Sequence, residues 1–141
     1  MRTKVSTKGF KYPHIIIRLS ILGLGIGDLA DAINERMAAE NRPHINYACV
    51  SKALHGKRTG RMSETIGVAD SITYQWVREY ADEYLRVIKP RLAEYGLNTN
   101  GMTARLHING LQRPEIWVQD YLGRAVAIYD VTEDYITYTG E

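Results

Sequence analysis

The sequence has a single cysteine, and this scarcity excludes several kinds of site. Cys49 has no second cysteine to pair with in the 141 residues, so neither an intramolecular disulfide nor a multi-cysteine zinc site can form. The four histidines, His14, His44, His55 and His107, lack the close spacing of a metal site. We therefore expect no metal, and the cysteine usage fits a reducing compartment.

Long apolar runs are also missing, because none approaches the roughly 20 residues that span a bilayer. The longest run, residues 14–26, is interrupted by Arg18 and by glycines. Residues 1–12 lack the pattern of a cleavable signal peptide. With 45% hydrophobic residues and no repeats, the composition is ordinary for a globular protein. We expect a cytoplasmic protein with no membrane partner.

The charged residues are distributed unevenly along the chain, although the net charge is only +2. Residues 1–61 contain eleven Lys and Arg and four acidic residues, which gives +7. Residues 62–141 contain seven basic and twelve acidic residues, which gives −5. The N-terminal part is basic and the C-terminal part is acidic. This distribution predicts that only the N-terminal part binds an anionic partner.

The periodicity of residues 1–40 predicts a basic, flexible arm over residues 1–12, followed by two helices. The first helix should cover residues 14–22 after Pro13, whose missing N–H costs nothing at a helix start. The second should run from residue 26 to 39 or 40. The expected core positions are Ile15, Ile16, Leu19 and Leu22 in the first helix and Ile26, Leu29, Ala30, Ile33 and Met37 in the second.

The glycine-rich stretch Gly23–Gly27 allows two interpretations. If residues 14–22 formed a strand, this stretch would resemble a nucleotide or methyl-donor loop, in which glycines let the backbone approach the ligand. Asp28 stands where the dinucleotide spacing requires a glycine, and no second β-α-β unit follows. A turn between two helices, without a cofactor, is the favoured interpretation.

Residues 46–61 carry the strongest functional signal. Asn46 is suited to cap a helix, and Gly56 is suited to end it. The buried side of this helix should carry Val50, Ala53 and Leu54, and its other side carries polar groups that suit base edges and phosphates in a major groove. The basic residues after the helix can meet phosphates. The predicted DNA-contacting residues are Asn46, Tyr47, Ala48, Ser51, Lys52, His55, Lys57, Arg58, Thr59 and Arg61.

Two segments resemble the helix-turn-helix of phage regulators. They are residues 23–30, GLGIGDLA, and residues 50–58, VSKALHGKR. The resemblance is to the lambda-repressor/Cro-like and Ner-like DNA-binding families, over about residues 13–72. It implies that the second segment is the recognition helix and its exit. Because residues 34–46 replace the usual tight turn, a longer second helix and a looped turn are expected.

Residues 62–95 predict two more helices. The first should be a short packing helix over residues 62–72. The second, over residues 74–95, should be capped by Ser71 or Thr73, and Pro90 should kink it or end it near Lys89.

The C-terminal residues change to a period of two, which predicts strands at residues 104–108, 116–121, 125–129 and 135–138. Turns are expected at residues 109–110 and 122–124. So small an antiparallel meander must pack on the helix before it or on a second subunit. Its aromatic residues fit a core or an interface, an effector pocket, or stacking on bases: Trp117, Tyr121, Tyr129, Tyr135 and Tyr138.

These features predict an α+β fold. A helical helix-turn-helix domain, residues 13–72, should follow the arm, and residues 73–141 should form a dimerisation region with a long helix and a small sheet. The expected function is that of a phage or prophage repressor. It would bind a double-stranded DNA operator as a homodimer, without covalent chemistry. The alternatives are a small cofactor-binding enzyme that uses Gly23–Gly27 and an adaptor that binds protein through the sheet.

Overall fold

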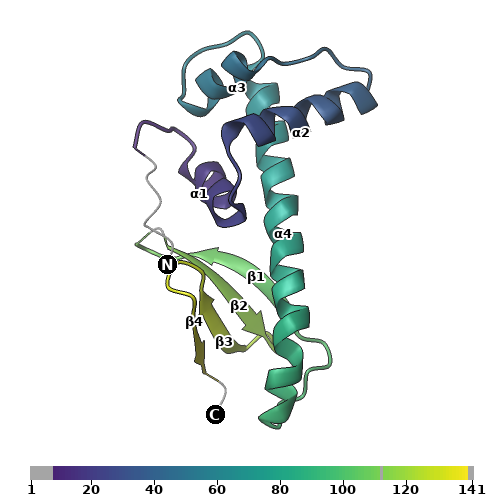
Figure 1. Cartoon of the computed structure of the whole chain (residues 1–141), viewed down its shortest axis with the longest axis vertical. Helices are drawn as coiled ribbons and strands as arrows, with labels where there is room; N and C mark the ends of the chain where they lie inside the picture. Colours follow the sequence, from purple (N-terminus) through teal and green to yellow (C-terminus); the bar gives the residue numbers. More distant parts are fainter. Residues whose placement is uncertain (1–7, 112, 140–141) are drawn as a thin grey trace. The chain divides into compact units, whose positions relative to one another are not determined.

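The computed structural model describes residues 8–111 and 113–139, which form an α+β fold (Figure 1). The helices are α1 (Pro13–Leu22), α2 (Ile26–Ala39), α3 (Tyr47–Leu54) and α4 (Met62–Glu94). The strands are β1 (Thr103–Ile108), β2 (Pro114–Gln119), β3 (Ala125–Asp130) and β4 (Tyr135–Tyr138). They pair antiparallel in the order β1-β2-β3-β4. The predicted fold class and the predicted meander are confirmed.

The described residues divide into two compact units, and the division falls within α4, between Trp76 and Val77. The first unit contains α1, α2, α3 and the first half of α4. The second contains the rest of α4 and the sheet. Within the described residues, no helix combines the length and the apolar content that crossing a membrane requires.

The first unit has one apolar core, to which all of its helices contribute. The predicted core positions of α2 and α3 are buried, except Ile26 at the start of α2, which is half-buried against the core. In α1, Ile16 and Leu22 are only half-buried, and Ile17 and Ile21 are buried instead. The run Ile15–Ile17 is apolar throughout, so periodicity alone does not determine which side of α1 faces inward. The core cluster comprises Ile15, Leu19, Leu29, Ala30, Ile33, Met37, Ile45, Val50, Leu54, Ala69 and Ile72.

Helix α4 is a single helix of 33 residues, so the prediction of two helices between residues 62 and 95 was wrong. The hydroxyl of Thr73 donates to the carbonyl of Ala69 at 2.8 Å, one turn earlier, and does not cap a new helix. A hydroxyl bonded in this way is satisfied inside a helix. The helix also continues through Pro90 to Glu94, so the predicted alternative of an end near Lys89 was wrong as well.

The hairpins of the sheet are each closed by an Asn or Asp side chain. The side-chain oxygens of Asn109, Asp120 and Asp130 accept backbone N–H groups from residues two to four positions later, at 2.9 to 3.0 Å. Such side chains replace a backbone partner in a turn. The turns predicted near residues 109–110 and 122–124 are therefore confirmed.

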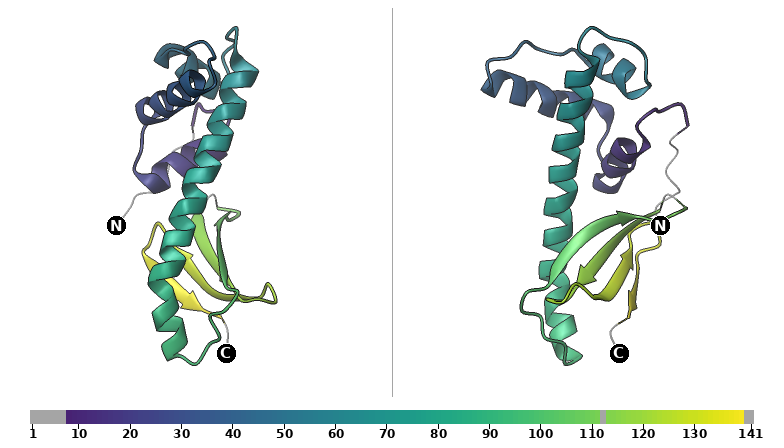
Figure 2. Two further views of the ribbon diagram at one scale, coloured as in Figure 1. Left: turned by 90° about the vertical axis from the view of Figure 1, so that its right-hand side faces the viewer. Right: turned by 180° about the vertical axis from the view of Figure 1, so that it is seen from behind.

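In the second unit, one face of the sheet packs on the second half of α4 (Figure 2). The prediction that the meander packs on the helix before it is therefore confirmed. The buried cluster comprises Leu85, Ile88, Leu92, Met102, Val118, Val126 and Ala127.

Candidate nucleic-acid interface

Helix α3 is capped at both ends. The side-chain oxygen of Asn46 accepts the N–H of Cys49 at 2.8 Å, as the sequence predicted. At the other end Gly56 has φ +79°, and the N–H groups of Gly56 and Lys57 donate to carbonyls of the last turn at 2.9 Å. This pattern is a Schellman motif, which requires a left-handed residue at the glycine position. The eight residues of α3 therefore have defined limits.

One side of α3 is buried and the other carries polar residues. Val50, Ala53 and Leu54 are fully buried against the first unit. Tyr47 is 56% exposed. Its ring lies next to Gly27, and a side chain at Gly27 would place its Cβ 4.0 Å from Cε2 of Tyr47. The start of α3 therefore lies beside the start of α2. The predicted DNA-facing residues at Asn46, Tyr47, Ala48, Ser51, Lys52 and His55 are all exposed or half-exposed.

The end of α3 contacts residues of the predicted N-terminal arm. The rings of Phe10 and His55 stack with their centroids 4.3 Å apart. The N–H of Lys11 donates to the carbonyl of Leu54 at 3.0 Å, and the Lys11 side chain lies against Gly56. Residues 8–12 therefore have a defined place, and the rest of the predicted arm lies outside the described residues. The sequence signal for the contact with α3 was Phe10, an aromatic residue in a basic segment.

The ring of His55 is oriented by the helix that carries it. Its Nδ1 lies 2.8 Å from the carbonyl oxygen of Ser51, one turn earlier. Because a carbonyl oxygen can only accept, Nδ1 must carry a proton in this geometry. In the neutral ring, Nε2 is then a hydrogen-bond acceptor. His55 can therefore offer an acceptor to an amino group of a partner.

The basic residues that follow α3 have two different environments. Lys57 and Arg58 are exposed, as the prediction of phosphate contacts requires. Thr59 is half-buried, and its hydroxyl is buried with no hydrogen-bond partner among the residues that the structure describes. Arg61 is half-buried, and its guanidinium bonds groups of the first unit itself. The structure therefore does not bring Arg61 together with Lys57 and Arg58.

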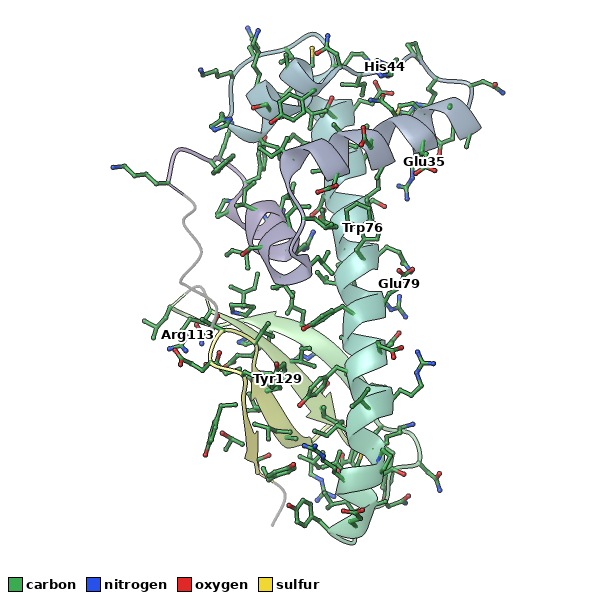
Figure 3. The ribbon with its side chains drawn as sticks, viewed as in Figure 1. Glu35, His44, Trp76, Glu79, Arg113 and Tyr129 are labelled. Carbon is green, nitrogen blue, oxygen red and sulfur yellow. The ribbon has the colours of Figure 1, made fainter. Side chains whose placement is uncertain are left out.

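Arg61 joins two loops of the first unit. Its Nη1 donates to the carbonyls of Pro43 and His44, at 2.7 and 3.1 Å (His44 is labelled in Figure 3). Its Nε donates to the carboxylate of Glu64 at 2.5 Å, and Arg42 also pairs with Glu64. The hydrogen bonds from Arg61 and then Arg42 lower the pKa of Glu64. This network holds the loop before α3 and the loop after it on the start of α4.

The long connection between α2 and α3 is fixed in position by the side chain of Asn34. Its side-chain oxygen accepts the N–H of Ile45 at 2.7 Å, and its Nδ2 donates to the carbonyl of Ile45 at 2.6 Å. Helix α2 extends to Ala39, and residues 40–46 form the loop. The expected longer second helix and looped turn are confirmed. Sequence reasoning identified the long connection but missed the role of Asn34.

The Gly23–Gly27 stretch is a turn between two helices. Residues 13–22 form α1, so the strand that a nucleotide loop requires is replaced by a helix. Gly23 ends α1 with φ +70°, and the N–H of Gly25 donates to Asp28 Oδ2 at 2.8 Å. Asp28 therefore occupies the N-terminus of α2, where a bound phosphate would otherwise lie. The predicted turn between two helices is therefore confirmed.

Within the described part of the chain, no three His, Cys, Asp or Glu side chains come together as a metal site. No known family model, curated protein or solved structure matches the chain. The functional interpretation therefore depends on α3 and its surroundings.

Proposed function

We propose that this protein is a sequence-specific, double-stranded DNA-binding regulator of the phage or prophage type. In this proposal it acts in the cytoplasm as a homodimeric repressor. The observation that carries the proposal is the exposed polar face of α3, which is capped at both ends and followed at once by Lys57 and Arg58. A short rigid helix with this surface suits insertion into a major groove.

Two groups of residues have different roles in the proposed DNA binding. Tyr47, Ser51 and His55 lie on the solvent side of α3 and can form hydrogen bonds with base edges. Ala48, on the same side, can contact the methyl group of thymine. Phosphate contacts come from basic residues around the end of the helix, and these contacts supply affinity that falls with salt. This phosphate-binding group comprises Lys11, Lys52, Lys57 and Arg58, all of which are exposed.

Arg61 has a supporting role in this proposal. Its guanidinium already bonds two carbonyls and a carboxylate within the unit, so a phosphate would compete with those partners. The mechanism is occupancy of an operator. Two recognition helices related by a two-fold axis would lie in successive major grooves, about 34 Å apart. Such a complex blocks access of polymerase to the same DNA.

Selection from random-sequence duplex DNA, followed by a salt titration, tests the proposal. The expected result is enrichment of a two-fold symmetric sequence, with affinity that falls steeply with salt. Absence of enrichment would reject the proposal. A rise in melting temperature on addition of nucleotides or methyl-donor cofactors would instead favour the cofactor-binding enzyme.

A matched pair of variants makes the selection specific to α3. Ser51→Ala removes a candidate base contact from the exposed face, and Ser63→Ala removes an exposed serine from the start of α4. We expect the first to change the selected sequence and the second to leave it unchanged. Identical selected sequences for both variants would count against base reading by Ser51.

A further inference from the structure

The outer edge of β4 is unpaired among the residues that the structure describes. Strand β4 pairs with β3 on one side, and no segment within residues 8–111 and 113–139 pairs with its other side. Its sequence is Tyr-Ile-Thr-Tyr, which is short but has no charged residue, proline or bulge, the other features by which proteins protect a sheet edge. The opposite edge, β1, carries the exposed Arg105. An edge such as that of β4 favours pairing with another strand.

The hydrogen-bonding direction along β4 follows from its pairing with β3. The N–H of Thr139 donates to the carbonyl of Val126 at 3.0 Å, so Thr139 faces β3. Backbone groups of successive residues in an antiparallel strand point alternately to the two sides. Ile136 and Tyr138 therefore direct their N–H and C=O groups away from β3, toward the open edge.

A groove lies beside this edge in the second unit. Its volume is about 330 Å³, and it is lined by residues of α4 and of the last two strands. The ring of Tyr129, labelled in Figure 3, stacks on Tyr84 at 4.5 Å inside it. Val87 is 64% exposed on the helix side. The two charged residues of the lining have opposite signs, Arg91 on α4 and Asp134 in the turn directly before β4.

We propose that β4 pairs antiparallel with β4 of a second copy of this chain, about a two-fold axis at Ile136. A two-fold axis perpendicular to the sheet places residues of the same face opposite each other. The outward bonding groups of Ile136 and Tyr138 allow an axis at Ile136 or at Thr137. We place the axis at Ile136 because this register sets Asp134 opposite Tyr138. The two sheets then join into one continuous antiparallel sheet. This inference identifies the surface of the homodimer and does not rest on DNA binding by α3.

The charges of the groove complement each other in this arrangement. Asp134 of the partner subunit lies opposite Tyr138, on the face that carries α4. The ring of Tyr138 contacts Tyr95 with centroids 5.2 Å apart, and Arg91 lies one turn earlier on α4. The partner's Asp134 therefore approaches Arg91, and the two-fold axis repeats this ion pair. A second copy of the chain would therefore pair with the edge of β4 and complement the charges of the groove.

Single cysteines in a Cys49→Ala background test the register. Ile136→Cys places two sulfurs opposite each other with Cα atoms about 5.5 Å apart, within the range for a disulfide. Thr137→Cys is the matched control, since its two copies lie two residues apart along the strands, with Cα atoms about 8 Å apart, beyond that range. Mild oxidation should give a covalent dimer from Ile136→Cys and little from Thr137→Cys. Faster cross-linking of Thr137→Cys, or none by either variant, overturns the proposal.

A second pair of variants tests the edge itself by analytical ultracentrifugation. Tyr138→Pro removes an outward N–H and leaves every β3–β4 hydrogen bond in place. Tyr138→Ala loses the same ring contact but keeps the N–H. We expect the dimer dissociation constant of Tyr138→Pro to exceed that of Tyr138→Ala at least about tenfold, because the two-fold axis doubles the lost bond. A monomeric wild type, or equal constants, overturns the proposal. A dimer insensitive to Tyr138→Pro that still selects an operator would reject this inference alone.

Discussion

The side-chain amide of Asn34 pairs with the backbone of Ile45 through two hydrogen bonds, of 2.6 and 2.7 Å. This pair joins the middle of α2 to the residue before the cap of α3. Ile45 is itself buried in the core of the first unit, so its side chain and its backbone are both fixed. Asn34 therefore helps to set the position at which α3 begins.

Asn34→Ala should destabilise the first unit by about 1 to 3 kcal/mol, because both backbone groups of Ile45 lose a partner in a half-buried site. Urea denaturation measures this loss. Asn98→Ala is the control, because the Asn98 side chain accepts an exposed N–H, from Asn100 in the same loop. A loss for Asn34→Ala no larger than that of the control would contradict the role of the pair.

The elements that local sequence determines were predictable. Asn46 and Gly56 delimit α3 because each suits one helix end, and the apolar spacing of α2 places its buried side. The strands followed from a change of period and from turn residues such as Gly123, which has φ +82°. In each case the decisive interaction lies within a few residues of the sequence signal.

Contacts between distant residues were not predictable. Arg61 is a basic residue in a basic stretch, and its bonds to Pro43 and His44 exist only after the loops fold. Local pattern also suggested a helix start at Thr73, which the continuous α4 overrides. The packing of residues 8–12 on α3 depends in the same way on tertiary structure.

Lys57→Ala should weaken binding to all DNA sequences and reduce the slope of log affinity against log salt by about one unit. The reason is that one exposed cation leaves the phosphate-binding group while the fold remains. Fluorescence anisotropy at several salt concentrations measures the slope. Lys89→Ala, in the second unit, is the matched control and should leave the slope unchanged. An unchanged slope for a folded Lys57→Ala would remove Lys57 from the phosphate-binding group.

Glu64 should make the stability of the first unit depend on acid pH. Hydrogen bonds from Arg61 and Arg42 hold its pKa below its usual value of about 4.3. The carboxylate therefore stabilises the fold above that pH, and this contribution is lost as the pH falls through the lower, folded pKa. Glu64→Gln should flatten the acid side of the stability curve, which thermal unfolding at several pH values measures. Asp31→Asn, on the exposed side of α2, is the control. Curves for Glu64→Gln and wild type that stay parallel in acid would contradict the assignment.

Tyr84 should make the second unit sensitive to alkali. Burial raises the pKa of its phenol to about 12, from about 10 in an unfolded chain. Since the folded state favours the neutral phenol, this contribution is complete below pH 10 and is lost as the pH rises from about 10 to 12. Tyr84→Phe keeps the ring that stacks on Tyr129 but removes the titrating group, so it should lose less stability over this range than the wild type. Tyr95→Phe, at a side chain that is 69% exposed, is the matched control. Unfolding followed by circular dichroism at fixed pH gives the comparison, and an equal alkaline loss for wild type and Tyr84→Phe would show that another group governs it.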